Sequence, residues 1–185
     1  YNEVFGIYHR EGTNLLVEDC EIYDTSNNGG YTGFAGSNLT IRRCNIYNWE
    51  NSGSAGSNVV VEDSYLHDHA YREGAHVDGI EWGLGSNVVI QNNRIAIVDQ
   101  TSCVNIGGVS GSVTNIQVLN NLFYGGTYSL ALEGRKGTTI LNTTIADNVW
   151  VKDSYLYGTH AISNVDAAQV HWSNNRFDDG TIISQ

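Results

Sequence analysis

Ionisable side chains of the kind used in sugar chemistry gather in one stretch, residues 67–81. This stretch holds three of the six histidines, four carboxylates, a tyrosine and an arginine: His67, Asp68, His69, Tyr71, Arg72, Glu73, His76, Asp78 and Glu81. A glycoside hydrolase needs a proton donor and a second carboxylate. A polysaccharide lyase needs a base and a cation that stabilises the developing enolate. Asp78 and Glu81 are the predicted catalytic pair, with His76 and Arg72 as their partners.

The same residues also have a simpler interpretation. Charged side chains are common in a long solvated loop, and Asp78 could serve only to cap the turn before Gly79. His67 and His69 alternate without an obvious third ligand, so no metal site is predicted there. An inert loop therefore stays open beside the active-site hypothesis. Glu81 carries the stronger functional expectation because it is an outward carboxylate in the centre of a predicted sheet.

Residues around this pair are predicted to bind substrate. Aromatic rings can stack on the C–H faces of sugars, while polar side chains fix their orientation. The predicted substrate-binding residues are Tyr8, Tyr71, Glu73, Trp82, Asp99, Gln100 and Asn105. They lie in the same stretch, in the equivalent loop one repeat later, or on strands expected in the same sheet.

Repeats along the chain must position these residues. Seven segments align without internal gaps, 20 to 29 residues apart, and they start at Asn14, Asn38, Asn58, Asn87, Asn115, Asn142 and Gln169. Apolar residues recur at the second, fourth and ninth positions, which is the alternation of a β-strand. Length differences fall between the segments, so they belong to loops. A fixed segment with variable insertions is typical of a solenoid.

Two columns of the alignment predict how the repeats stack. A small polar residue recurs at one bend, namely Cys20, Cys44, Ser64, Asn93, Asn121, Asn148 and Asn175. An apolar core column contains Ile22, Ile46, Leu66, Ile95, Phe123, Trp150 and Phe177. Strands stack ~4.8 Å apart, so amides in one column can hydrogen-bond to each other. Cys20 and Cys44 would be neighbours, more simply as two small side chains than as a disulfide.

The predicted fold class is all-β. We expect a right-handed parallel β-helix, a solenoid of about seven coils with three strands per coil, in one domain over residues 1–185. Third strands are predicted at residues 6–9, 79–82, 104–106, 130–132 and 161–163, and they form one sheet. Its outward column is predicted to hold Tyr8, Glu81, Asn105, Ala131 and Ser163. The chain lacks Met and starts inside a repeat, so we expect a segment of a longer chain.

Charge and composition exclude some partners. The formal net charge of −11 repels phosphate backbones, so no nucleic acid is expected to bind. No apolar run approaches the ~20 residues that cross a bilayer. Side-by-side association of copies, and attachment to further β-helix coils, both stay open.

The sequence resembles the secreted right-handed parallel β-helix repeat proteins of bacteria. The resemblance covers nearly the whole chain and is carried by GSNVVIQNNRI, NIQVLNNLFYGGTYSLALEG and HVDGIE. The wider pectate lyase-like superfamily includes polygalacturonases, whose NTDGID motif is similar to residues 76–81. Only Asp78 matches that pattern, with Glu81 as a conservative change. The paired aspartates of that family fall here at Thr101 and Ser102, and the Asp-Pro-His pattern of mannuronan epimerases is missing.

Two functions follow from these expectations. The first is an extracellular carbohydrate-active enzyme, a polysaccharide lyase or glycoside hydrolase with a groove near Asp78 and Glu81. The alternative is a non-catalytic glycan-binding, adhesin or structural rod module of a larger extracellular assembly. The negative charge favours neutral glycans. A polyuronate would need Ca²⁺ held by carboxylates such as Asp78 and Glu81.

Overall fold

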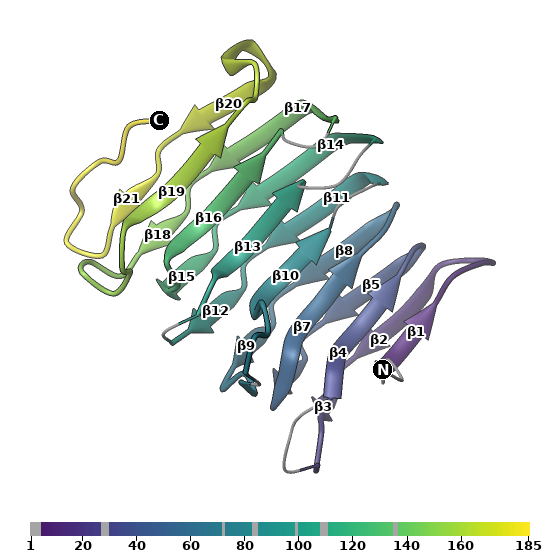
Figure 1. Cartoon of the computed structure of the whole chain (residues 1–185). Coiled ribbons are helices and arrows are strands. Elements are labelled where there is room, and N and C mark those ends of the chain that lie inside the picture. Colours follow the sequence, from purple (N-terminus) through teal and green to yellow (C-terminus); the bar gives the residue numbers. More distant parts are fainter. Residues whose placement is uncertain are drawn as a thin grey trace.

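A computed structural model describes residues 5–26, 30–71, 73–82, 85–98, 100–107, 111–134 and 137–185. Three parallel sheets of seven strands each wind into a β-solenoid, as Figure 1 shows. The first sheet contains β1 (Phe5–His9), β4 (Gly30–Gly36), β7 (Trp49–Ala55), β10 (Asp78–Trp82), β13 (Ser102–Gly107), β16 (Tyr128–Glu133) and β19 (Gly158–Ser163). The second contains β2 (Leu15–Glu18), β5 (Leu39–Arg42), β8 (Val59–Glu62), β11 (Gly85–Gln91), β14 (Gly111–Leu119), β17 (Thr138–Ala146) and β20 (Val170–Ser173). The third contains β3 (Glu21–Tyr23), β6 (Asn45–Tyr47), β9 (Tyr65–His67), β12 (Arg94–Ile97), β15 (Leu122–Gly125), β18 (Val149–Trp150) and β21 (Arg176–Phe177).

This arrangement confirms the predicted parallel β-helix with three strands per coil. The apolar column from Ile22 to Phe177 is paired strand by strand through the third sheet. It packs into one continuous core with the inward side chains of the other two sheets. In the described part of the chain the one helical element is a 3₁₀ turn, Ala167–Gln169, and no helix there has the length and apolarity to cross a bilayer.

Every bend between the second and third sheets consists of two residues. The first adopts a left-handed conformation, with φ between 50° and 59°, at Asp19, Arg43, Asp63, Asn92, Asn120, Asp147 and Asn174. Asn and Asp tolerate this region better than other non-glycine residues, which explains their frequency there. The second residue is the predicted small polar one, and it points inward: Asn93, Asn121, Asn148 and Asn175 are all buried.

The buried asparagines form the predicted ladder. The Oδ1 of Asn121, Asn148 and Asn175 each accepts two hydrogen bonds from the asparagine one coil earlier, at 3.0–3.1 Å. One comes from the backbone N–H of that asparagine and the other from its Nδ2. Ser64 and Cys44 extend the ladder, because the N–H of Cys44 donates to Ser64 Oγ. Cys20, Cys44 and Cys103 are free thiols; Cys44 is buried as expected, whereas Cys20, on the first coil, is exposed.

The two other corners are less uniform. The connections from the third sheet to the first range from one residue, Asn48, to ten, residues 68–77. After β21 the chain folds back, so that Ile183 is buried and its carbonyl accepts from the Trp172 indole at 2.8 Å. This segment covers the core at the C-terminal end of the solenoid.

Two details of the predicted first sheet need correction. The strands β4 and β7 were not predicted, because their sequences, GYTGFAG and WENSGSA, are rich in small residues and lack a clear alternation. The outward column ends at Ala161 and not at Ser163, since Ala131 pairs with Ala161 and Ser163 pairs with Glu133.

Candidate active site

Asp78, the first residue of β10, is fully buried and tightly held. Its backbone N–H donates to Asn51 Oδ1 at 2.7 Å. Its carboxylate Oδ2 accepts from Asn105 Nδ2 at 3.1 Å. Asp78 Oδ1 and Asn105 Oδ1 are buried without a partner among the described residues. Asp78 is therefore held from both neighbouring strands, through its backbone by Asn51 and through its side chain by Asn105, and is not on the surface.

Glu81 lies three residues further along β10 and shares a partner with Asp78. The Asn51 amide that accepts from Asp78 also donates its Nδ2 to Glu81 Oε1 at 3.0 Å. Burial raises the pKa of Glu81 to about 7, and the charges of Asp78 and Glu50 add to the shift. A carboxylic acid with this pKa is partly protonated near neutral pH. Glu81 can therefore give a proton as well as take one.

His76 is the accessible member of the group, with its side chain 65% exposed. Its Nδ1 lies 3.4 Å from Asp78 Oδ2. This contact raises the pKa of His76, and the charges of Asp78, Glu81 and Glu133 raise it further. The imidazolium is the form that these carboxylates stabilise, with its Nδ1–H donating to Asp78.

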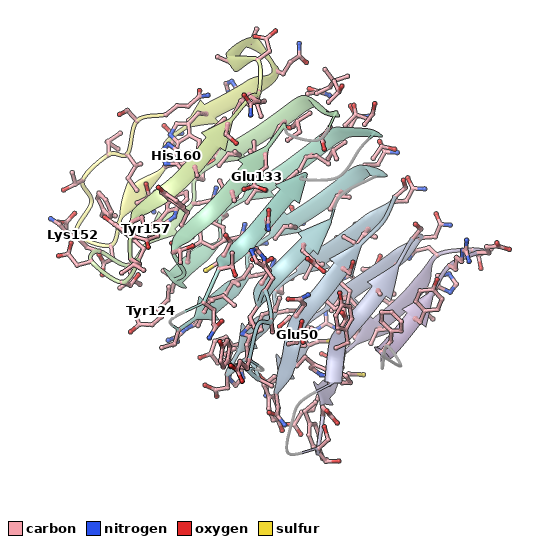
Figure 2. The ribbon with its side chains drawn as sticks, viewed as in Figure 1. Glu50, Tyr124, Glu133, Lys152, Tyr157 and His160 are labelled. Atoms are coloured by element: carbon pink, nitrogen blue, oxygen red, sulfur yellow. The ribbon has the colours of Figure 1, made fainter. Side chains whose placement is uncertain are left out.

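Strands that sequence reasoning missed or misplaced supply the rest of the site. The strand β7 contributes Asn51 and Glu50, both buried. The strand β16 ends at Glu133, which was not among the predicted site residues and is half-buried in the same sheet. Figure 2 shows Glu50 near the start of β7 and Glu133 toward the end of β16. The sequence signal for Asn51 and Glu50 was weak, since an Asn and a Glu in a Ser/Gly-rich segment look like a turn.

The structure thus brings together four of the predicted residues, Asp78, Glu81, His76 and Asn105. Tyr71 and Glu73 are exposed in the loop before β10. Tyr8 is exposed on β1 and stacks on Phe5, three strands away from Glu81.

The remaining predicted residues do not join this group. Gln100 lines a separate hollow with residues of later coils. Arg72 and Asp99 lie outside the described residues, as does the side chain of Trp82. A groove beside Glu81 and the roles of all these residues stay predictions.

The two other histidines of the stretch have partners of their own. His67 contacts Asp68 and Asn45 through its two ring nitrogens, at 2.7 and 2.8 Å. His69 Nε2 lies 2.8 Å from Ser52 Oγ, and burial lowers the pKa of His69 to about 4. Among the residues described, no three His, Cys, Asp or Glu side chains converge as metal ligands. Calcium dependence stays a prediction.

Comparisons with known proteins add the following. No protein-family model and no curated protein sequence matches this chain. The A-module of the mannuronan C-5 epimerase AlgE4 from Azotobacter vinelandii is similar in structure, with 13% identity, 94% of this chain and 58% of that chain covered, and a TM-score of 0.48. The Dettilon tailspike protein has 12% identity, 93% and 49% coverage, and a TM-score of 0.46. A glycoside hydrolase has 12% identity, 93% and 38% coverage, and a TM-score of 0.49.

This chain therefore spans 58% or less of the length of each of these proteins. At such identities the likeness concerns the winding of the chain and not the chemistry of any side chain.

Proposed function

We propose that this protein hydrolyses glycosidic bonds in a neutral polysaccharide outside the cell, with Glu81 as the proton donor. The observation that carries the proposal is the Asn51 amide, which joins the backbone of Asp78 to the carboxyl group of Glu81. It holds Glu81 in one orientation beside a buried carboxylate. A charged neighbour and burial together keep a proton on an acid near neutral pH, as general acid catalysis requires.

Glu133 is the proposed second carboxylate. Glu81 pairs with Asn105, Asn105 pairs with Ala131, and Glu133 follows two residues later on β16. Two strand spacings and two residue rises place the Cα atoms of Glu81 and Glu133 about 12 Å apart. Their long side chains can reduce this gap toward the carboxyl separation of about 6.5–9.5 Å that inverting hydrolases use.

The reaction then follows from these roles. Glu81 gives its proton to the glycosidic oxygen as the bond between that oxygen and the anomeric carbon breaks. Water forms the new bond to the anomeric carbon and loses its proton to Glu133. Asp78, being fully buried, acts as a positioning residue: its charge favours the protonated form of Glu81 and orients His76. His76, exposed at the site, donates to sugar hydroxyl groups.

Hydrolysis fits the local charge better than elimination does. The groups described around Glu81 are mostly acidic, namely Asp78, Glu50 and Glu133, with His76 as the cation beside them. A lyase must bind a uronate carboxylate and stabilise a second negative charge on it. The carboxylates of Asp78, Glu50 and Glu133 oppose that binding, whereas a neutral sugar has no such penalty.

A reducing-sugar assay over a panel of neutral polysaccharides and polyuronates tests the proposal. Glu81→Gln and Glu133→Gln should each lower the rate on the best substrate at least about 100-fold. Glu11→Gln, in an exposed loop, is the matched control and should leave the rate unchanged. Asp78→Asn should lower the pKa of Glu81 and move the alkaline limb of the pH–rate profile to lower pH. The proposal is wrong if Glu81→Gln keeps wild-type activity, or if the wild-type protein cleaves none of the neutral polysaccharides.

A further inference from the structure

A hollow of about 220 Å³ lies on the loop side of the solenoid, away from the acidic site. Its walls come from three successive connections between the third and first sheets, and they contain Gln100, Gly126, Thr127, Ser154, Tyr155 and Leu156. All six residues are uncharged, although the chain as a whole has a net charge of −11. The hollow therefore suits a neutral ligand that has hydroxyl groups and an apolar face.

The walls of the hollow are fixed by hydrogen bonds between coils. Leu156 N donates to Gly126 O at 2.9 Å, and Thr127 N donates to Gln100 O at 2.8 Å. Ser154 Oγ accepts from Gly125 N at 3.0 Å and donates to Val151 O at 2.7 Å. A ligand entering this hollow does not need to order the loops first, which lowers the cost of binding.

Two exposed side chains follow Tyr155 in the last of these three connections. Tyr157 is 69% exposed and Leu156 is 67% exposed. The ring of Tyr128 supports Tyr157, with 5.7 Å between ring centroids. Gly158 leaves space for the Tyr128 ring, since a Cβ at residue 158 would lie 3.3 Å from that ring. Figure 2 shows Tyr157 where the chain enters β19.

Asp78 and Tyr157 lie at the same edge of the first sheet, and Glu81 lies three residues further along β10. Asp78 pairs with Ser102 at the start of β10 and β13, and Tyr128 pairs with Gly158 at the start of β16 and β19. The strands β13 and β16 are themselves adjacent. Three strand spacings and three residue rises therefore separate the Cα atoms of Glu81 and Gly158 by about 17 Å. An extended sugar chain that crosses the sheet obliquely can contact both.

We infer that this hollow and Tyr157 form a distal binding subsite for one uncharged sugar ring of an extended saccharide. The side of the cleaved bond on which this ring lies rests on the proposed function. The binding of a neutral ring here does not depend on that function. The ring enters with a hydroxymethyl or hydroxyl group toward Gln100, Thr127 and Ser154. Its C–H face stacks on Tyr157, an aromatic with a polar handle that suits a surface that is half apolar and half wet.

Calorimetric titration of the Glu81→Gln protein tests the subsite without turnover. The ligands are cellohexaose, xylohexaose, mannohexaose and, as the charged comparison, an oligogalacturonate of the same length. We expect at least one neutral hexaose to bind, more tightly than the oligogalacturonate does. Adding Tyr157→Ala should weaken that binding about tenfold. Tyr157→Phe should retain it, because the ring remains.

Tyr23→Ala is the matched control, since Tyr23 is also an exposed tyrosine but lies on the third sheet near the other end. It should leave the affinity unchanged. The inference is overturned if no neutral hexaose binds or if Tyr157→Ala binds as tightly as its parent. It is also overturned if sedimentation shows that Tyr157 instead mediates self-association, lost in Tyr157→Ala.

The outcomes separate this inference from the proposed function. If binding depends on Tyr157 but the wild-type protein hydrolyses nothing, the subsite is supported and the proposed hydrolase activity is wrong. If the wild-type protein hydrolyses a substrate and Tyr157→Ala changes neither KM nor kcat, the hydrolase activity is supported and the subsite is wrong. If both are right, Tyr157→Ala raises KM for long chains and leaves the cleavage of short ones unchanged.

Discussion

Two corners of the solenoid follow opposite rules. The bends between the second and third sheets all have two residues, a left-handed one and a small one that is buried from Cys44 onward. The connections between the third and first sheets vary from one residue to ten. The first corner repeats the same hydrogen bonds in coil after coil. The second places different side chains in every coil, and both the acidic site and the hollow beside Tyr157 lie along it.

The difference shows how this fold separates stability from chemistry. At the uniform corner a buried amide satisfies backbone groups of adjacent coils, so the position tolerates few residue types. At the variable corner an insertion extends into solvent without disturbing the strands, because the ladder on the opposite side still sets the register. Substitutions at the two corners should therefore differ in kind: loss of stability at the first, and loss of function or even a gain of stability at the second.

The largest effect on stability is expected at Asn148 in the buried ladder. Its Oδ1 accepts from Asn121 N and Nδ2, and its Nδ2 donates to Val118 O and Asn175 Oδ1. Asn148→Ala leaves several of these buried groups unpaired, so it should lower the free energy of unfolding by about 3 kcal/mol. Urea denaturation monitored by circular dichroism measures the change.

Asn45→Ala is the control for that change. Asn45 is only half-buried on the outer side of the third sheet, where water can replace its bonds. It should cost less than about 1 kcal/mol. Equal losses for Asn148→Ala and Asn45→Ala would mean that the buried ladder has no special role in holding the coils together.

The next effect, of opposite sign, is expected at Glu81 in the acidic site. The folded protein holds a proton on Glu81 up to a pKa of about 7, whereas the unfolded chain releases it near the ordinary glutamate pKa of 4.5. As pH rises through this window, the charged form disfavours the folded state, so stability is lost. Glu81→Gln removes this loss and should be about 2 kcal/mol more stable than the wild type at pH 8.

The two proteins should differ little at pH 4, where Glu81 is protonated in both the folded and unfolded states. Unfolding free energies measured across the pH range for both proteins check this. A pH-independent difference between Glu81→Gln and the wild type would contradict the raised pKa. A gain of stability on removing a functional group is the usual sign of a strained site.

The contrast between the corners also explains which parts of the structure could be predicted from sequence. The segments headed by asparagine align because one strand, one two-residue bend and the next strand have constant length. The core column from Ile22 to Phe177 and the ladder from Ser64 to Asn175 could therefore be found by spacing alone. The strand β7 could not, because nothing in WENSGSA marks a strand, and its register depends on pairing with β4 and β10.

The acidic site was only partly predictable for the same reason. Asp78, Glu81 and His76 are close in sequence, so their proximity in space was expected. Asn51 lies 27 residues before Asp78 and Glu133 lies 52 residues after Glu81, and only the stacking of coils brings them near. The burial of Asp78 was not predictable either, because it directly follows the ten-residue connection 68–77, which fits no repeat. Sequence therefore located the site, whereas its hydrogen bonds and protonation states needed the structure.

The smallest effect is expected at the third corner, where a second ladder of asparagines is exposed. Asn87 has φ of 59°, and its Nδ2 donates to Asn58 Oδ1 at 2.9 Å. Water can replace that amide bond, so the left-handed backbone should matter more than the side chain. Asn87→Ala keeps the Cβ but loses the short polar side chain that makes this conformation tolerable for Asn, and it should cost about 1 kcal/mol. Asn87→Gly relieves the backbone and should cost only a few tenths. Urea denaturation of both variants distinguishes the contribution of the left-handed backbone from that of the side-chain amide. If Asn87→Gly is as destabilising as Asn87→Ala, the exposed amide bonds stabilise this corner as the buried ones stabilise theirs. The two ladders would then not differ in their role.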